Sequence, residues 1–191
     1  GWTALCAKYK PLVEAARKEG HEVWMTLPVE GETFPMQDNG AASLLIGAPA
    51  KDNMMKLYNL MNLTQGIVGF VSSPRPAFVH SVQDSRPIVG EIFRRGMAFV
   101  DTSPNPAALP RDAAESSKSP YAAVDFVFDG DLSESVMRER LAKLEELAKN
   151  RGYASVLIAA DAATYPLLLD WWTGLAQKEI ATVPLSALAK K

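Results

Sequence analysis

The feature that most constrains the fold is a junction that recurs along the chain, in which the end of an amphipathic helix is followed at once by a short apolar run. The apolar runs with this junction are residues 21–27, 97–100, 153–158 and 180–183, and two more without it are 66–71 and 122–128. In the first three junctions a glycine closes the helix, because glycine adopts the left-handed conformation at little cost. A series of helix-to-strand connections predicts an α/β fold with mainly parallel strands and crossover helices.

Two helices are predicted clearly in the second half of the chain. Residues 132–149 begin with a capping box made by Asp131 and Glu134, and residues 165–177 form the other helix. The stripes expected to be buried are Met137, Leu141, Leu144 and Ala148 on the first helix, and Leu168, Trp171, Trp172 and Leu175 on the second. A chain of 191 residues with this pattern fits one domain over residues 1–191.

Three long connections rich in proline, glycine or serine each follow a predicted strand: residues 28–49, 72–76 and 102–120. In a parallel α/β fold, the loops after the carboxyl ends of the strands form the functional face. A site is therefore expected on these loops.

The sequence gives no reason to expect a nucleic-acid partner and contains no membrane span in this segment. The net charge is −2, so no basic excess exists to bind the phosphates of a nucleic acid. No apolar run reaches the roughly 18 residues that a membrane span requires. The sequence also lacks a P-loop, a dinucleotide-binding glycine motif, a nucleophile elbow and a zinc-protease motif. Its single cysteine, Cys6, lies in an apolar helical stripe and is expected to be a core residue.

Carboxylates follow several predicted strands, and Glu30, Asp101 and Asp161 are the candidates for catalysis. They could serve acid–base chemistry or bind a cation, or they could simply cap loops and helices. The two histidines are poorly placed for a metal site, because a catalytic zinc usually needs three protein ligands. His21 opens a strand at the opposite end from the expected site, and His80 lies just ahead of a helix.

The order of motifs resembles the divergent polysaccharide deacetylase family, whose members are relatives of the NodB-like carbohydrate deacetylases. The similar segments are residues 20–30 (GHEVWMTLPVE), 34–45, 66–78, 95–101 (RGMAFVD) and 183–188 (VPLSAL). The resemblance implies an incomplete or distorted β/α barrel that lacks one or two N-terminal strands, together with the aspartate pair on the first of them.

The resemblance also implies a cation held by an aspartate and two histidines, which would activate the attacking water. The family's Asn-His positions are Ser72 and Ser73 here, and the late Gly-His-Pro is replaced by residues 160–162, with Asp161 at the histidine position. A serine hydroxyl is a poor zinc ligand because it stays neutral. Arg75, between two prolines, could pair with a carboxylate or contact sugar hydroxyls, or it could be a solvated loop arginine. Ser72, Ser73 and Arg75 are thus the candidate substrate-binding residues.

These replacements favour a domain that is degenerate at the metal site, has no cofactor, and binds a glycan or an envelope protein. The resemblance alone implies that it is a periplasmic or envelope-associated bacterial domain. The alternative is an active carbohydrate deacetylase with a rearranged site, in which Asp101, Asp161 and Glu30 surround a divalent metal such as zinc. A third possibility is a purely structural interaction module.

Overall fold

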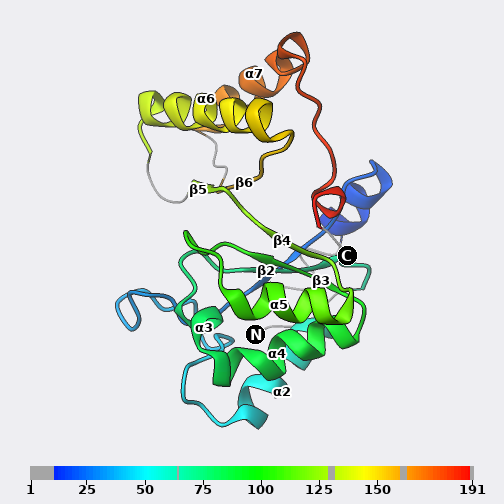
Figure 1. Ribbon diagram of the computed structural model, residues 1–191, viewed down its shortest axis with the longest axis vertical. Helices are drawn as coiled ribbons and strands as arrows, with labels where there is room; N and C mark the ends of the chain where they lie inside the picture. The colour runs from blue at the N-terminus through cyan, green and yellow to red at the C-terminus, as the bar shows by residue number, and fades with distance from the viewer. Residues whose placement is uncertain (1–10, 64, 129–131, 160–162, 190–191) are drawn as a thin grey trace. The chain divides into compact units, whose positions relative to one another are not determined.

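The computed structural model describes residues 11–63, 65–128, 132–159 and 163–189. The chain folds as two compact units, one formed by Gly1–Ala123 with Pro184–Lys191 and the other by Val124–Val183 (Figure 1). Within the described residues, no helix combines the length and apolar character that crossing a bilayer requires.

The first unit is built on a four-stranded parallel sheet. Its strands, in spatial order, are β1 (Met25–Leu27), β2 (Gly69–Ser72), β3 (Ala98–Asp101) and β4 (Tyr121–Ala123). After a helix over residues 11–18 come α2 (Ala50–Met61), α3 (Ala77–His80), α4 (Val82–Arg94) and α5 (Ala108–Ser117). The prediction of an α/β fold with parallel strands and crossover helices is confirmed.

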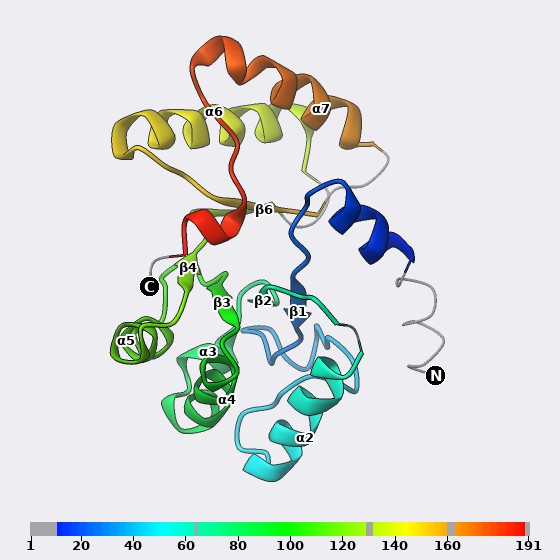
Figure 2. The same ribbon diagram turned by 90° about the vertical axis from the view of Figure 1, so that its right-hand side faces the viewer.

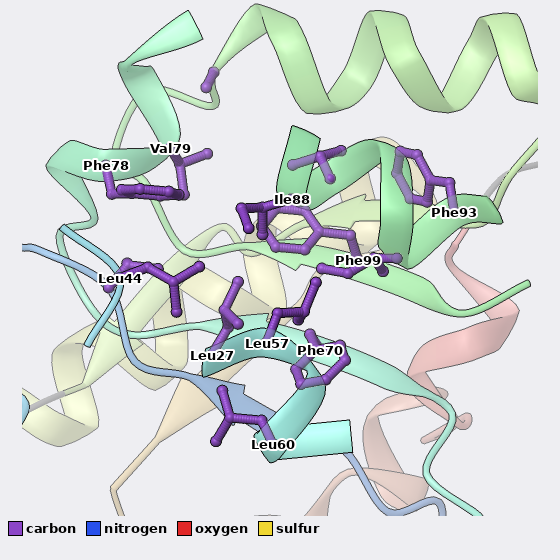
Figure 3. Close-up of a cluster of buried hydrophobic side chains, with 14 of the residues drawn as sticks. Leu27, Leu44, Leu57, Leu60, Phe70, Phe78, Val79, Ile88, Phe93 and Phe99 are labelled. Carbon is purple, nitrogen blue, oxygen red and sulfur yellow. The ribbon is translucent and has the colours of Figure 1, made fainter. Parts of the chain in front are cut away.

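The core of this unit lies between the sheet and its helices. Leu27, Phe70 and Phe99 project from three neighbouring strands toward Leu57 of α2 and Ile88 of α4 (Figure 3). All five side chains are at most 1% exposed. Burial of such a side chain contributes roughly 1.5–3 kcal/mol, so this layer fixes the sheet and thereby the position of the strand ends.

The second unit contains a parallel pair, β5 (Phe126–Phe128) and β6 (Val156–Ile158), with α6 (Glu134–Arg151), α7 (Tyr165–Gly174) and the short turn η1 (Ala176–Lys178). Figure 2 shows α7 lying alongside α6. Phe128, Met137 and Leu141 form the buried centre, and Leu168 and Trp171 of α7 pack against it.

Some details of the predicted elements are wrong. Residues 122–128 are not one strand, since β4 and β5 belong to different sheets. The break falls at Asp125, whose carboxylate accepts hydrogen bonds from Ser155 N–H (2.8 Å) and Arg151 Nη2 (2.6 Å). Residues 180–183 form no strand either, because none of the described strands pairs with them.

The predicted helix details are partly right. Met137, Leu141 and Leu144 are buried as expected, whereas Ala148 is only half-buried. The cap of α6 is Ser133, whose Oγ accepts the N–H of Val136 at 3.4 Å, while Asp131 lies outside the described residues. Trp172 points outward and is 56% exposed.

A carboxylate links two segments that the sequence comparison singled out. Glu22, near the start of β1, accepts hydrogen bonds from the indole Nε1 of Trp24 (3.1 Å) and from both the N–H (3.1 Å) and the hydroxyl of Ser186. Ser186 lies in the terminal turn η2 (Leu185–Ala187). The GHEV segment, through Glu22, therefore contacts the VPLSAL segment, through Ser186.

Glu91 provides a pH-dependent contribution to the stability of α4. Its carboxylate accepts hydrogen bonds from Arg94 (2.7 and 2.8 Å) and Arg95 (2.7 Å), and these bonds lower its pKa from 4.5 to about 2. Because the pKa of Glu91 is lower in the folded chain than in the unfolded chain, its ionisation stabilises the fold. This stabilisation is complete at pH values above the unfolded pKa and disappears as the pH falls through about 2.

We expect Glu91→Gln to lower the Tm at pH 6, and the difference from wild type to vanish near pH 2. In the control, Glu134→Gln, the partners Glu134 and Arg138 are both more than half exposed, so a smaller change is expected. An equal Tm difference at both pH values would contradict the prediction.

Candidate functional site

Four polar side chains gather where β2 and β3 end. Ser72, Ser73, Asp101 and Thr102 are each at most 3% exposed, and we call them the strand-end cluster. They lie together because the parallel pairing of β2 with β3 brings their carboxyl ends to one edge of the sheet. Of the candidates named from the sequence, Ser72, Ser73 and Asp101 lie at this edge, and their role as a site stays a prediction.

The link between the two strands is made by Ser72 and Thr102. The hydroxyl of Thr102 donates to the carbonyl of Ser73 at 2.9 Å. Its only proton is thereby used, so in the 3.0 Å contact between the two hydroxyls Ser72 must be the donor. Ser72 Oγ also accepts the N–H of Thr102 at 3.0 Å. Both hydroxyl protons are therefore used within the protein, and each oxygen also accepts one hydrogen bond.

Ser73 joins β2 to the loop after β1. Its hydroxyl donates to the carbonyl of Val29 and accepts the N–H of the same residue, both at 3.2 Å. The amide of Asn39 donates to Ser73 Oγ at 3.2 Å and to the carbonyl of Val29 at 2.9 Å. Ser73 therefore holds the loop in place, and its oxygen has little capacity for another partner.

Asp101 is fully buried at the end of β3. One carboxylate oxygen accepts the N–H (2.8 Å) and the hydroxyl (2.5 Å) of Ser103, and the other accepts the N–H of Ala107 at 2.8 Å, just before α5. Burial, together with the nearby charge of Asp101, raises the pKa of Tyr121 well above its ordinary value. The geometry favours a structural role for Asp101, in which its carboxylate caps the turn that leads into α5, over a role as a catalytic base.

The other candidates from the sequence lie in the surrounding loops. Glu30 accepts the N–H of Ile46 at 3.0 Å, which ties the start of the loop after β1 to its end. Arg75 is exposed, has a positive φ of 51°, and accepts the N–H of Glu32 on its carbonyl at 3.1 Å. Asp161 lies outside the described residues. His21 and His80 are both exposed.

Sequence reasoning missed Thr102, Ser103 and Asn39. For Thr102 and Ser103 a signal existed, because they directly follow β3 just as Ser73 directly follows β2. Asn39 gave no such signal, since it lies in the middle of a long loop and reaches Ser73 only in the folded chain.

The described residues do not fit a metal centre. No three His, Cys, Asp or Glu side chains in the described ranges are grouped closely enough to hold an ion. In the strand-end cluster, the only anionic group is Asp101, and backbone and hydroxyl protons already occupy its oxygens. The serine hydroxyls are neutral donors that zinc binds poorly.

The fold and this site define a parallel α/β domain with a hydroxyl-rich, internally bonded cluster at its strand ends. Residues 3–189 match the sequence model of the divergent polysaccharide deacetylase family, and the chain belongs to that family. The chain is also similar to the crystal structure of the uncharacterized protein ATU2773 from Agrobacterium tumefaciens C58. The two share 27% identity with a TM-score of 0.82, over 93% of this chain and 72% of the other. No curated protein sequence matches the chain.

Proposed function

We propose that this chain is a non-hydrolytic member of its family, a bacterial envelope domain that binds a glycan or an envelope protein. The observation that carries the proposal is that every hydroxyl proton of the strand-end cluster is already used in a hydrogen bond within the protein. Ser73, at the position where the family resemblance implies a histidine ligand, bonds the backbone of Val29 and the amide of Asn39.

The chemistry of deacetylation supports this interpretation. A metal-dependent deacetylase needs a cation to polarise the acetyl carbonyl and to lower the pKa of the attacking water. A neutral hydroxyl that already donates its proton supplies no such ligand, and Asp101 would have to give up buried hydrogen bonds to become one. Breaking bonds to a buried carboxylate costs about 1.5–3 kcal/mol each.

The test is an acetate assay on the full chain. We expect no acetate above the blank when the protein is incubated with chitotetraose and zinc, and less than stoichiometric metal after dialysis. An active carbohydrate deacetylase assayed in parallel serves as the positive control. Metal-dependent release of acetate would overturn the proposal.

The rival function is an active deacetylase with a rearranged site, and one observation favours it. Asp161 follows β6 by only three residues, at the position where the resemblance implies a ligand. If this rival is correct, the chain retains a divalent metal, and Asp161→Asn abolishes both metal retention and acetate release. Under the main proposal, Asp161→Asn changes neither measurement.

A further inference from the structure

The loop after β1 contains the one asparagine of the chain that is followed by a glycine, Asn39 before Gly40. The other five asparagines are followed by methionine, leucine, proline or arginine. Asn39 and Gly40 are both exposed, and a Cβ on Gly40 would meet no heavy atom within 4 Å. The backbone nitrogen of Gly40 is therefore free of the steric obstruction that a side chain imposes on its approach to a neighbouring group.

Asp38 places a base beside that nitrogen. Its carboxylate accepts the N–H of Gly40 at 2.9 Å, so the proton that the nitrogen must lose to become a nucleophile already lies in a hydrogen bond to the carboxylate. A carboxylate within hydrogen-bond reach of the proton that it removes has the geometry of a general base. Three consecutive residues thus supply a base, an amide carbonyl to be attacked and the attacking nitrogen.

The side-chain amide of Asn39 also belongs to the hydrogen bonding of the strand-end cluster. Its Nδ2 donates to the carbonyl of Val29 at 2.9 Å and to Ser73 Oγ at 3.2 Å. Because a backbone carbonyl can only accept, the group on Val29 must be the amino group of the amide. The same carbonyl accepts the hydroxyl of Ser73 at 3.2 Å, and Val29 is fully buried. Replacing the amino group by an oxygen would set one acceptor against another.

We propose that the segment Asp38–Gly40 is a self-modification site at which the amide of Asn39 becomes a carboxylate. The nitrogen of Gly40 bonds to Cγ of Asn39 and passes its proton to Asp38. The Cγ–Nδ2 bond breaks, and Asp38 gives the proton to the departing ammonia, which leaves a cyclic imide. Water, the one co-reactant, adds to either imide carbonyl and opens the ring to aspartate or isoaspartate, whose new carboxyl group gives its proton to the ammonia. The reaction involves no sugar and no metal, so it is independent of the proposed function.

The new carboxylate changes the bonding of Ser73. Residue 39 no longer donates to the carbonyl of Val29, and the hydroxyl of Ser73 turns to the carboxylate, because a hydrogen bond to a charged group is the stronger one. The carbonyl of Val29 then loses both of these donors. The modification therefore weakens the link between the loop after β1 and the end of β2.

The first experiment incubates the full chain at mildly alkaline pH and measures the modified fraction of each asparagine by peptide mass spectrometry. We expect conversion at Asn39, while Asn62, which is also exposed but precedes a leucine, stays intact. Asp38→Ala is expected to slow the conversion about tenfold or more in the folded chain, and much less in urea, where the carboxylate is no longer held on Gly40. The matched control is Asp52→Ala, at an exposed carboxylate of α2, which should leave the rate unchanged. Absence of conversion at Asn39, or equal rates in folded wild type and Asp38→Ala, overturns the proposal.

The second experiment measures the consequence for the strand-end cluster in Asn39→Asp, which carries the product side chain. The N–H of Val29, which donates to Ser73 Oγ at 3.2 Å, is expected to exchange with solvent about tenfold faster or more. The control Asn59→Asp makes the same change at an exposed position of α2 and should leave this exchange unaltered. An unchanged circular dichroism spectrum verifies folding of each variant. Equal exchange at Val29 in wild type and Asn39→Asp would overturn the effect on Ser73.

Discussion

Gly69→Ala is expected to destabilise the first unit by about 3 kcal/mol or more. Gly69 pairs with Ala98 where β2 meets β3. A Cβ at this position would lie 2.0 Å from the carbonyl oxygen of Ala98 and 2.6 Å from its carbonyl carbon. Because the obstructing atoms are backbone, they can yield only if the two strands separate. The free energy of unfolding from urea titration measures the effect.

The matched control is Gly90→Ala in α4. A Cβ there meets no heavy atom within 4 Å, and alanine is favoured over glycine in a helix by about 1 kcal/mol. We therefore expect unchanged or increased stability. If both variants had the same stability, the close approach of β2 and β3 at Gly69 would be contradicted.

The parallel sheet could be predicted because helix ends and apolar runs leave a local pattern. The junction before residues 97–100 correctly placed β3, since glycine and apolar spacing act over a few residues. The break between β4 and β5 could not be predicted in the same way. It depends on Asp125 bonding Ser155 and Arg151, which are distant in sequence and become neighbours only when the second unit folds.

The candidate site shows the same division between position and role. Ser72, Ser73 and Asp101 could be assigned to one edge because the carboxyl ends of parallel strands meet there. Their roles depend on partners that the sequence does not reveal, such as Val29 and Asn39 for Ser73. For Asp101, the sequence left catalysis and capping equally open, and the three donors around its carboxylate favour capping.

Asp101→Ala is the second substitution for which we expect a large effect. It removes the acceptor for Ser103 N–H and Ala107 N–H and leaves both donors buried without a partner. Each orphaned donor costs about 1–3 kcal/mol, so a total loss of about 3–5 kcal/mol is expected. Asp101→Asn keeps one acceptor oxygen and should lose about half as much. Urea unfolding measures both losses.

Hydrogen exchange distinguishes a capping Asp101 from a catalytic one. If Asp101 caps the turn into α5, the amides of Ser103 and Ala107 should lose protection in Asp101→Ala, and much less in Asp101→Asn. Amides of α6 in the second unit serve as the internal control and should be unaffected. A catalytic base is usually dispensable for folding, so a variant of wild-type stability with unchanged amide protection would contradict the capping role. It would also weaken the case for a non-hydrolytic domain, because the carboxylate would then be free to act on a substrate or a cation.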